Sequence, residues 1–97
     1  MKIPNTVRIA GVDYTVEFHE RMIGNDGNRI IGKINYTQAT VKIDKFGQDY
    51  QNQCKTFFHE VMHGVAEHFK LDLDEDVIDS IANGFYMVIM DNPEMFK

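Results

Sequence analysis

The chain has 97 residues and a mass of 11.2 kDa, which is the size of a single small domain. Its residues are 43% hydrophobic, 11% aromatic and 26% charged, a composition typical of a packed globule and unlike that of disordered or fibrous chains. The net charge is -5, so the sequence has no excess of cations to bind phosphate or anionic lipid. We therefore expect neither nucleic acid nor a membrane among its partners.

The cysteine content and the amino terminus predict where the protein is located. Cys54 is the single cysteine, so no disulfide can form within the chain, whereas small secreted domains usually contain several. Residues 1–5 lack the apolar core of a signal peptide, and no stretch reaches the roughly twenty apolar residues of a membrane span. We therefore expect a soluble, cytoplasmic protein that is not processed by signal peptidase.

Apolar and polar residues alternate through the first half of the chain, as they do in strands with one buried face. This alternation predicts four short strands, at residues 6–9, 12–18, 30–36 and 40–44. Residues 10–11 connect the first two strands and residues 37–39 connect the last two, each as the turn of a hairpin. We expect a small, mostly antiparallel sheet made of two hairpins.

After Gly47 the apolar residues recur every three or four positions, which is the spacing of a helix with one apolar face. The spacing predicts helices at about residues 49–69 and 75–90, with Asp74 as the N-cap of the second helix and Asn92-Pro93 as its end. The residues expected to form the two apolar faces are Cys54, Phe58, Val61, Met62, Val65 and Phe69 in the first helix, and Ile78, Ile81, Ala82, Phe85, Val88 and Ile89 in the second. Residues 1–97 are therefore expected to form one α+β domain, a sheet followed by two helices.

The first predicted helix contains His59-Glu60-Val61-Met62-His63, an HExxH motif. Residues at i and i+4 lie about 40° apart around a helix and one turn apart along it, so both imidazoles can bind the same metal ion. Glu60 lies about 100° from His59, where its carboxylate can reach a water molecule on that ion. Chance alone produces only about 0.01 matches to the motif in a chain of this composition. We therefore expect His59 and His63 to be metal ligands and Glu60 to be the general base.

A catalytic zinc ion usually has three protein ligands, so one more must come from outside this helix. The start of the second helix contains Glu75, Asp76 and Asp79. Asp79 is related to the apolar face of its helix as His59 is to its own, so we prefer Asp79 as the remaining ligand. Glu75, one turn earlier and longer, is the competing ligand, although carboxylates in a first turn also stabilise a helix N-terminus.

Two further features suggest structural roles. Tyr86 is expected at the boundary of the core, and stabilisation of an oxyanion is the alternative for its hydroxyl. Gly64 and Gly84 lie inside helices, where glycine costs about 1 kcal/mol relative to alanine, so we expect each to permit close contact with another backbone.

Three segments support a family resemblance: residues 3–16, residues 56–64 with the HExxH motif, and residues 76–86. With these segments the chain resembles the small phage-encoded zincin-like metallopeptidases along nearly its whole length. In the related minimal gluzincins and ImmA/IrrE-type peptidases, the third zinc ligand is a Glu followed three residues later by Ala and then by Asp or Asn. The segment 79–83 matches that pattern, with Asp79 in place of Glu. The resemblance implies a zincin-like fold in which His59 and His63 bind Zn²⁺ and Glu60 activates water.

We therefore expect a zinc metallopeptidase that hydrolyses a protein or peptide substrate, in the cytoplasm of a bacterial host if the chain is phage-encoded. An exposed edge strand, residues 41–44, is expected to hold an extended substrate beside the cleft. The alternative is a catalytically silent zinc-binding module that interacts with another protein. Glu60 favours the enzyme, because a purely structural zinc ion needs no base beside its ligands.

Overall fold

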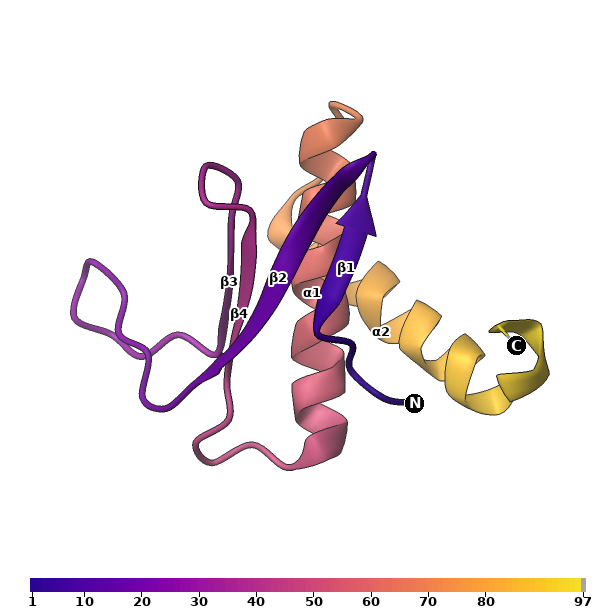
Figure 1. Cartoon of the computed structure of the whole chain (residues 1–97), viewed down its shortest axis with the longest axis horizontal. Helices are drawn as coiled ribbons and strands as arrows, with labels where there is room; N and C mark the ends of the chain where they lie inside the picture. The colour runs from indigo at the N-terminus through magenta and orange to yellow at the C-terminus, as the bar shows by residue number, and fades with distance from the viewer. Residues whose placement is uncertain (97) are drawn as a thin grey trace.

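Four strands form one sheet and two helices follow them in the chain, as Figure 1 shows. The computed structural model describes residues 1–96. The elements are β1 (Thr6–Ile9), β2 (Val12–His19), β3 (Gly32–Asn35), β4 (Thr40–Asp44), α1 (Tyr50–His68), α2 (Glu75–Asp91) and the 3₁₀-helix η1 (Pro93–Phe96). The predicted α+β class and the order of its elements are confirmed.

The strand order in the sheet is β1-β2-β4-β3. Both hairpins are antiparallel, but β2 and β4 pair in parallel, with Val16 opposite Val41, so the sheet is mixed. In the second hairpin, β4 and not β3 lies beside β2. The burial of the strands explains this choice, because four of the five residues of β4 are buried whereas none of β3 is. The expectation that residues 41–44 form an exposed edge is therefore wrong, and β3 is the edge strand on this side.

Asp44, at the end of β4, fixes the segment between β2 and β3. Its carboxylate is fully buried and accepts hydrogen bonds from the backbone N–H groups of Arg21, Met22 and Phe46 at 2.8–3.2 Å. The guanidinium of Arg29 donates a further bond at 3.1 Å. Although burial raises the pKa of Asp44, the bond from the Phe46 N–H and those from Arg29, Met22 and Arg21 bring this pKa below its usual value. The segment 20–31 is thereby attached to the sheet.

The core lies between the sheet and α1. Its buried residues include Ile9, Tyr14, Val16, Val41, Ile43, Cys54 and Phe57. Cys54 is in the core as expected, whereas Phe69 is 62% exposed because it caps the end of α1 beyond the sheet. The expected face was therefore only partly right: Phe58, Val61 and Val65 are half-buried against the core, whereas the other buried residues of α1 were not expected, namely Thr56, Phe57, Glu60, Gly64 and Ala66.

The second helix, α2, packs on α1 and on η1 but, among the described residues, on no strand. Its N-cap is Asp74, whose carboxylate accepts a hydrogen bond from the Val77 N–H at 3.0 Å, as predicted. The residues that α2 buries are Ile78, Ala82 and Tyr86. Phe85 and Val88, which were expected on the buried face, are 53% and 43% exposed. The face of α2 that turns away from α1 is therefore apolar and uncovered.

Within residues 1–96, no helix has both the length and the apolar character that crossing a bilayer requires.

The buried Asp44 carboxylate should contribute strongly to stability. We expect Asp44→Asn to lower the free energy of unfolding by about 2 kcal/mol at pH 7, because hydrogen bonds to a charged acceptor are worth about 1.5–3 kcal/mol. The pKa of Asp44 is lower in the folded than in the unfolded state, so its contribution is complete above the unfolded value of about 3.9 and is lost as the pH falls through the folded value. Urea denaturation between pH 7 and pH 2.5 measures both effects.

Asp13→Asn is the matched control, because the Asp13 carboxylate pairs with Arg8 at the surface and its side chain is 68% exposed. This substitution should change the free energy of unfolding by less than about 1 kcal/mol. Equal losses in the two variants would contradict the role assigned to Asp44.

Candidate metal centre

Helix α1 presents both histidines of the HExxH motif to the same point. The helix starts at Asp49, whose side chain caps it by accepting a hydrogen bond from the Asn52 N–H at 2.8 Å. His59 and His63 follow on consecutive turns, with their ring centroids 4.9 Å apart. Their Nε2 atoms lie 3.2 Å apart and face each other. The predicted convergence of the two imidazoles is present in the structure.

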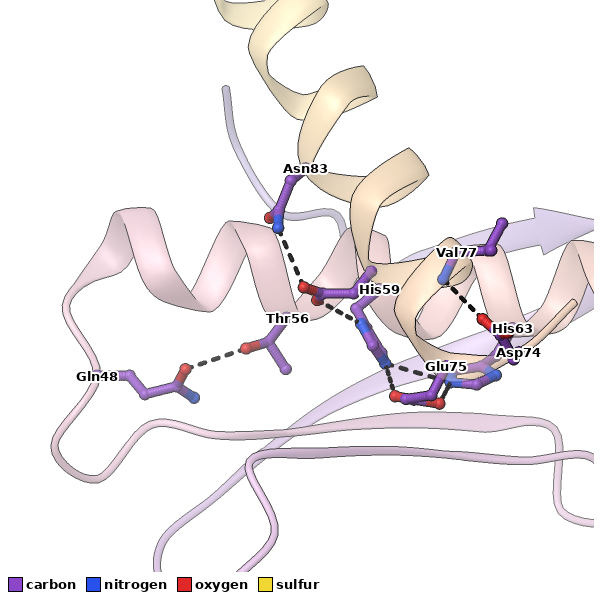
Figure 2. A network of polar contacts seen from close by, with 9 residues as sticks. Gln48, Thr56, His59, His63, Asp74, Glu75, Val77 and Asn83 are labelled. Atoms are coloured by element: carbon purple, nitrogen blue, oxygen red, sulfur yellow. Dashed lines mark hydrogen bonds and ion pairs between the residues drawn. The ribbon is translucent and has the colours of Figure 1, made fainter.

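Glu75, in the first turn of α2, completes a group of three. Its Oε1 lies 2.5 Å from Nε2 of His59 and its Oε2 lies 2.9 Å from Nε2 of His63, so the carboxylate spans both rings (Figure 2). Glu75 is the first residue of α2 after the Asp74 cap, and α2 packs on α1, so its carboxylate meets the imidazoles of His59 and His63. His59, His63 and Glu75 each offer a ligand atom, and these atoms lie within 4.8 Å of one another.

Asp79 lies on the other side of the same imidazole. Its Oδ1 is 3.0 Å from Nδ1 of His59, and its Oδ2 accepts a hydrogen bond from the Asn83 amide at 3.3 Å. A proton on Nδ1 that is donated to Asp79 leaves the Nε2 lone pair of His59 directed at His63 and Glu75. The geometry therefore favours Glu75, the competing candidate, as the third ligand and gives Asp79 the task of orienting His59.

The spacing of the two imidazoles fits a zinc ion, and the Glu75 carboxylate, at 2.5 Å from Nε2 of His59, would have to move outward to admit it. Two ligands bound at about 2.0–2.1 Å to a tetrahedral ion are about 3.3 Å apart, close to the 3.2 Å that separates the two Nε2 atoms. Two imidazoles and one carboxylate are also a ligand set that catalytic zinc sites use. Although burial lowers the pKa of His59, the hydrogen bond to Asp79 and the charges of Glu60 and Glu75 raise this pKa above its usual value. The surroundings of His59 therefore favour positive charge.

Glu60 is enclosed between α1 and the edge strand. It is 8% exposed, and burial together with the charge of Glu75 raises its pKa to about 7, against the opposing effects of His59 and a hydrogen bond from the Ile34 N–H. By the helical wheel Glu60 should face away from the core, toward a cleft, and this expectation is wrong for its exposure. The strand β3 covers this position, so Glu60 lies inside the molecule next to His59.

Gly32 in β3 permits this enclosure. A Cβ atom at this position would lie 2.5 Å from Cγ2 of Thr56, which is too short for a real contact, and 3.0 Å from Oε2 of Glu60, which is tight. Thr56 cannot turn away freely, because it is buried and its hydroxyl donates to the Gln48 side chain at 3.0 Å. The strand can approach this turn of α1 only because residue 32 has no side chain.

A cleft of about 490 Å³ opens over these residues. One wall is the edge strand with the segment before it, the floor is α1, and the other wall is the start of α2. The lining residues are Arg29, Ile30, Ile31, Gly32, Gln48, Asn52, Lys55, Thr56, His59, Glu60, Glu75, Asp79 and Asn83. The candidate metal centre is therefore at one end of a cleft large enough for part of a peptide.

Several residues that the sequence suggested lie elsewhere. Tyr86 is buried in the core beside Phe58, with its ring 6.0 Å away, which agrees with the structural role and not with oxyanion binding. Gly64 faces the side chains of Ile9 and Ile34 in the sheet, and a Cβ added to Gly84 would meet no atom within 4 Å. The expectation of close backbone contacts at both glycines is therefore wrong.

Sequence reasoning missed two contributors to the site. Nothing distinguished Gly32 from the other glycines of the chain, because its role depends on which strand lies beside α1. The orienting contact of Asp79 was missed because the sequence does not tell which imidazole nitrogen a carboxylate will reach. Asn83 lies one turn after Asp79, and this spacing was a signal that the Asp79 carboxylate would accept a hydrogen bond within α2.

Searches of protein-family models, of curated proteins and of solved structures find no match to this chain.

The contact at Gly32 should be sensitive to a single methyl group. We expect Gly32→Ala to lower the free energy of unfolding by about 1–3 kcal/mol, the usual cost of overpacking. Gly84→Ala, in open space on α2, should raise it by about 0.5–1 kcal/mol. Urea denaturation compares the two.

Thr56→Ser tests the cause, because it removes Cγ2 and keeps the hydroxyl. Combined with Gly32→Ala, it should recover part of the lost stability. Strictly additive losses in the double variant would show that the two positions do not interact.

Replacing each carboxylate at the start of α2 by an amide should change the Zn²⁺ affinity by an amount that depends on the role of the residue. Glu75→Gln should weaken Zn²⁺ binding by about 100-fold or more, because it removes a ligand, and Asp79→Asn by about 10-fold, because it removes an orienting contact. Asp76→Asn, in the same turn of α2, should leave the affinity unchanged. Competition with a chromophoric chelator measures all three, and a larger loss for Asp79→Asn than for Glu75→Gln would restore Asp79 as the ligand.

Proposed function

We propose that this protein is a zinc-dependent peptidase that works in the cytoplasm on protein or peptide substrates. The observation that supports this proposal is the convergence of His59, His63 and Glu75 beside a buried carboxylate, Glu60, at the end of a cleft. The HExxH motif and the resemblance to small phage-encoded zincin-like peptidases lead to the same proposal. His59, His63 and Glu75 are the proposed ligands.

In this proposal each residue of the site has a separate task. A bound zinc ion would supply an acidified water molecule and a Lewis acid for the scissile carbonyl. Glu60 accepts the proton of the attacking water on a carboxylate oxygen and later passes it to the leaving amine. Burial and the charge of Glu75 raise the pKa of Glu60 in the metal-free site, which makes its carboxylate a stronger base than an exposed one. Asp79 keeps the Nε2 lone pair of His59 directed at the ligand position.

The outer edge of β3 at Gly32, next to the Ile34 N–H that donates to Glu60, is the proposed support for an extended substrate. The Asp44 N–H donates to the Ile31 carbonyl at 2.9 Å, so in this antiparallel pair residues 31, 33 and 35 face β4, and Gly32 and Ile34 face outward. The N–H and carbonyl of Gly32 are then available to an added strand beside the cleft. This assignment replaces the earlier expectation for residues 41–44.

Glu60→Gln should abolish hydrolysis while leaving the fold and zinc binding intact, because an amide keeps the shape and cannot accept the proton. The loss of a general base typically lowers the rate by about 10²–10⁴-fold. Cleavage of a peptide library by the zinc-loaded protein measures the rate, and chelator competition measures the metal. Glu67→Gln, an exposed position on the same helix, is the control.

A Glu60→Gln variant that cleaves as fast as the parent would remove Glu60 from this role. A parent protein that binds zinc but cleaves nothing would favour the second candidate, a zinc-binding interaction module. The uncovered apolar face of α2, with Phe85 and Met87 more than half exposed, is the observation that favours that alternative.

A further inference from the structure

The cleft has a cationic end that the proposed chemistry does not use. Lys55 lines the cleft and precedes His59 by one turn of α1. Its side chain is partly buried, and within residues 1–96 no hydrogen bond or ion pair to it is found. The other cation of the lining besides His59 is Arg29, which is already bound to Asp44 and to the Phe46 carbonyl.

The carboxylates that line the cleft, Glu60, Glu75 and Asp79, are gathered at His59. Glu75 and Asp79 contact His59 directly, and Glu60 is its neighbour in the chain. Near Lys55 the lining consists of neutral polar groups, the side chains of Gln48 and Asn52. Gln48 is occupied by Thr56 and by the Asp44 carbonyl. Lys55 is thus a cation in the cleft lining that has no hydrogen-bond or ion-pair partner within residues 1–96, which favours an anionic partner.

The position of Lys55 fixes its distance from the reacting bond. Four residues of helix advance about 6 Å along the axis. An extended peptide advances about 3.3 Å per residue. A peptide lying along the cleft therefore passes Lys55 roughly two residues from the bond held at the metal centre.

The chain direction of β3 decides which side of the scissile bond lies near Lys55. Gly32 lies beside Thr56, and Ile34 lies beside Gly64, so β3 and α1 run in the same direction. A peptide that pairs with β3 in the more stable antiparallel manner runs in the opposite direction. Its residues on the carboxyl side of the scissile bond then lie toward Lys55.

We propose that Lys55 determines substrate specificity by binding a carboxylate roughly two residues to the carboxyl side of the scissile bond. The carboxylate is either an Asp or Glu side chain or the carboxyl terminus of a short peptide. This inference rests on the proposed peptidase function. A partly buried ion pair of about 1 kcal/mol corresponds to a preference of about fivefold over a neutral residue.

The test uses the zinc-loaded protein and a fluorogenic peptide set with Glu, Gln or Lys at each position around the cleaved bond. Each peptide is made with a free and with an amidated carboxyl terminus. The wild type should cleave the Glu peptide about fivefold faster than the Gln peptide when the residue is on the carboxyl side. Lys55→Gln should abolish this preference, and Lys55→Glu should reverse it in favour of Lys.

Lys2→Gln is the matched control, since Lys2 is exposed and does not line the cleft. It should keep the wild-type preference. If the preference depends on Lys55 and on a Glu side chain in the peptide, Lys55 binds an acidic residue. If the preference disappears when the carboxyl terminus is amidated, Lys55 binds the terminal carboxylate. A preference that Lys55→Gln leaves intact, or that lies on the amino side of the bond, would overturn the assignment.

Binding separates this inference from the proposed function. Fluorescence anisotropy of the same peptides with the zinc-loaded Glu60→Gln variant, with and without Lys55→Gln, reports recognition without turnover. If binding shows a charge preference that requires Lys55, but the zinc-loaded wild type cleaves no peptide of the set, the peptidase is refuted and the carboxylate site is retained. Binding without any such preference, or no binding of any peptide, would refute the role of Lys55.

Discussion

Gly32 lets the edge of the sheet touch α1 at the turn that contains Glu60, and the arrangement of the site depends on this contact. Because residue 32 has no side chain, β3 can cover Glu60. The burial of Glu60 is the main cause of the raised pKa of its carboxyl group. The same approach makes β3 one wall of the cleft. A backbone contact thus sets both the electrostatics of the base and the surface along which a substrate would lie.

Helix α1 connects the two halves of the molecule. One side packs on the sheet and supplies the core residues Cys54 and Phe57, and another packs on α2. His59, Glu60 and His63 lie between these contacts, so that the sheet encloses the base while α2 supplies the carboxylates to the imidazoles. The Asp74 cap fixes the start of α2, which is one wall of the cleft, and the Asp44 hydrogen bonds fix the segment before β3, which is part of the other wall. The site is therefore built from the ends of elements held on one central helix.

Much of this architecture could be predicted from the sequence, because periodicity is a local property. The two helices, the two hairpins, the Asp74 cap and the histidine pair all follow from spacing and turn chemistry. The parallel pairing of β2 with β4 could not be predicted, since β3 and β4 show the same alternation and only tertiary burial decides which is interior. Phe85 and Val88 fit an apolar face by period, yet within residues 1–96 the packing of α2 buries only Ile78, Ala82 and Tyr86.

The choice between Glu75 and Asp79 shows why a helical wheel was insufficient. The two residues are four apart and share one face of α2, so periodicity treats them alike. The imidazole of His59 has two nitrogens, however, and each of the two carboxylates reaches a different one, Glu75 at Nε2 and Asp79 at Nδ1. The longer side chain extends past the ring of His59 to meet His63 as well, whereas the shorter one ends at the nearer nitrogen. Side-chain length, combined with the crossing of α2 over α1, therefore separates a ligand from the group that orients a ligand.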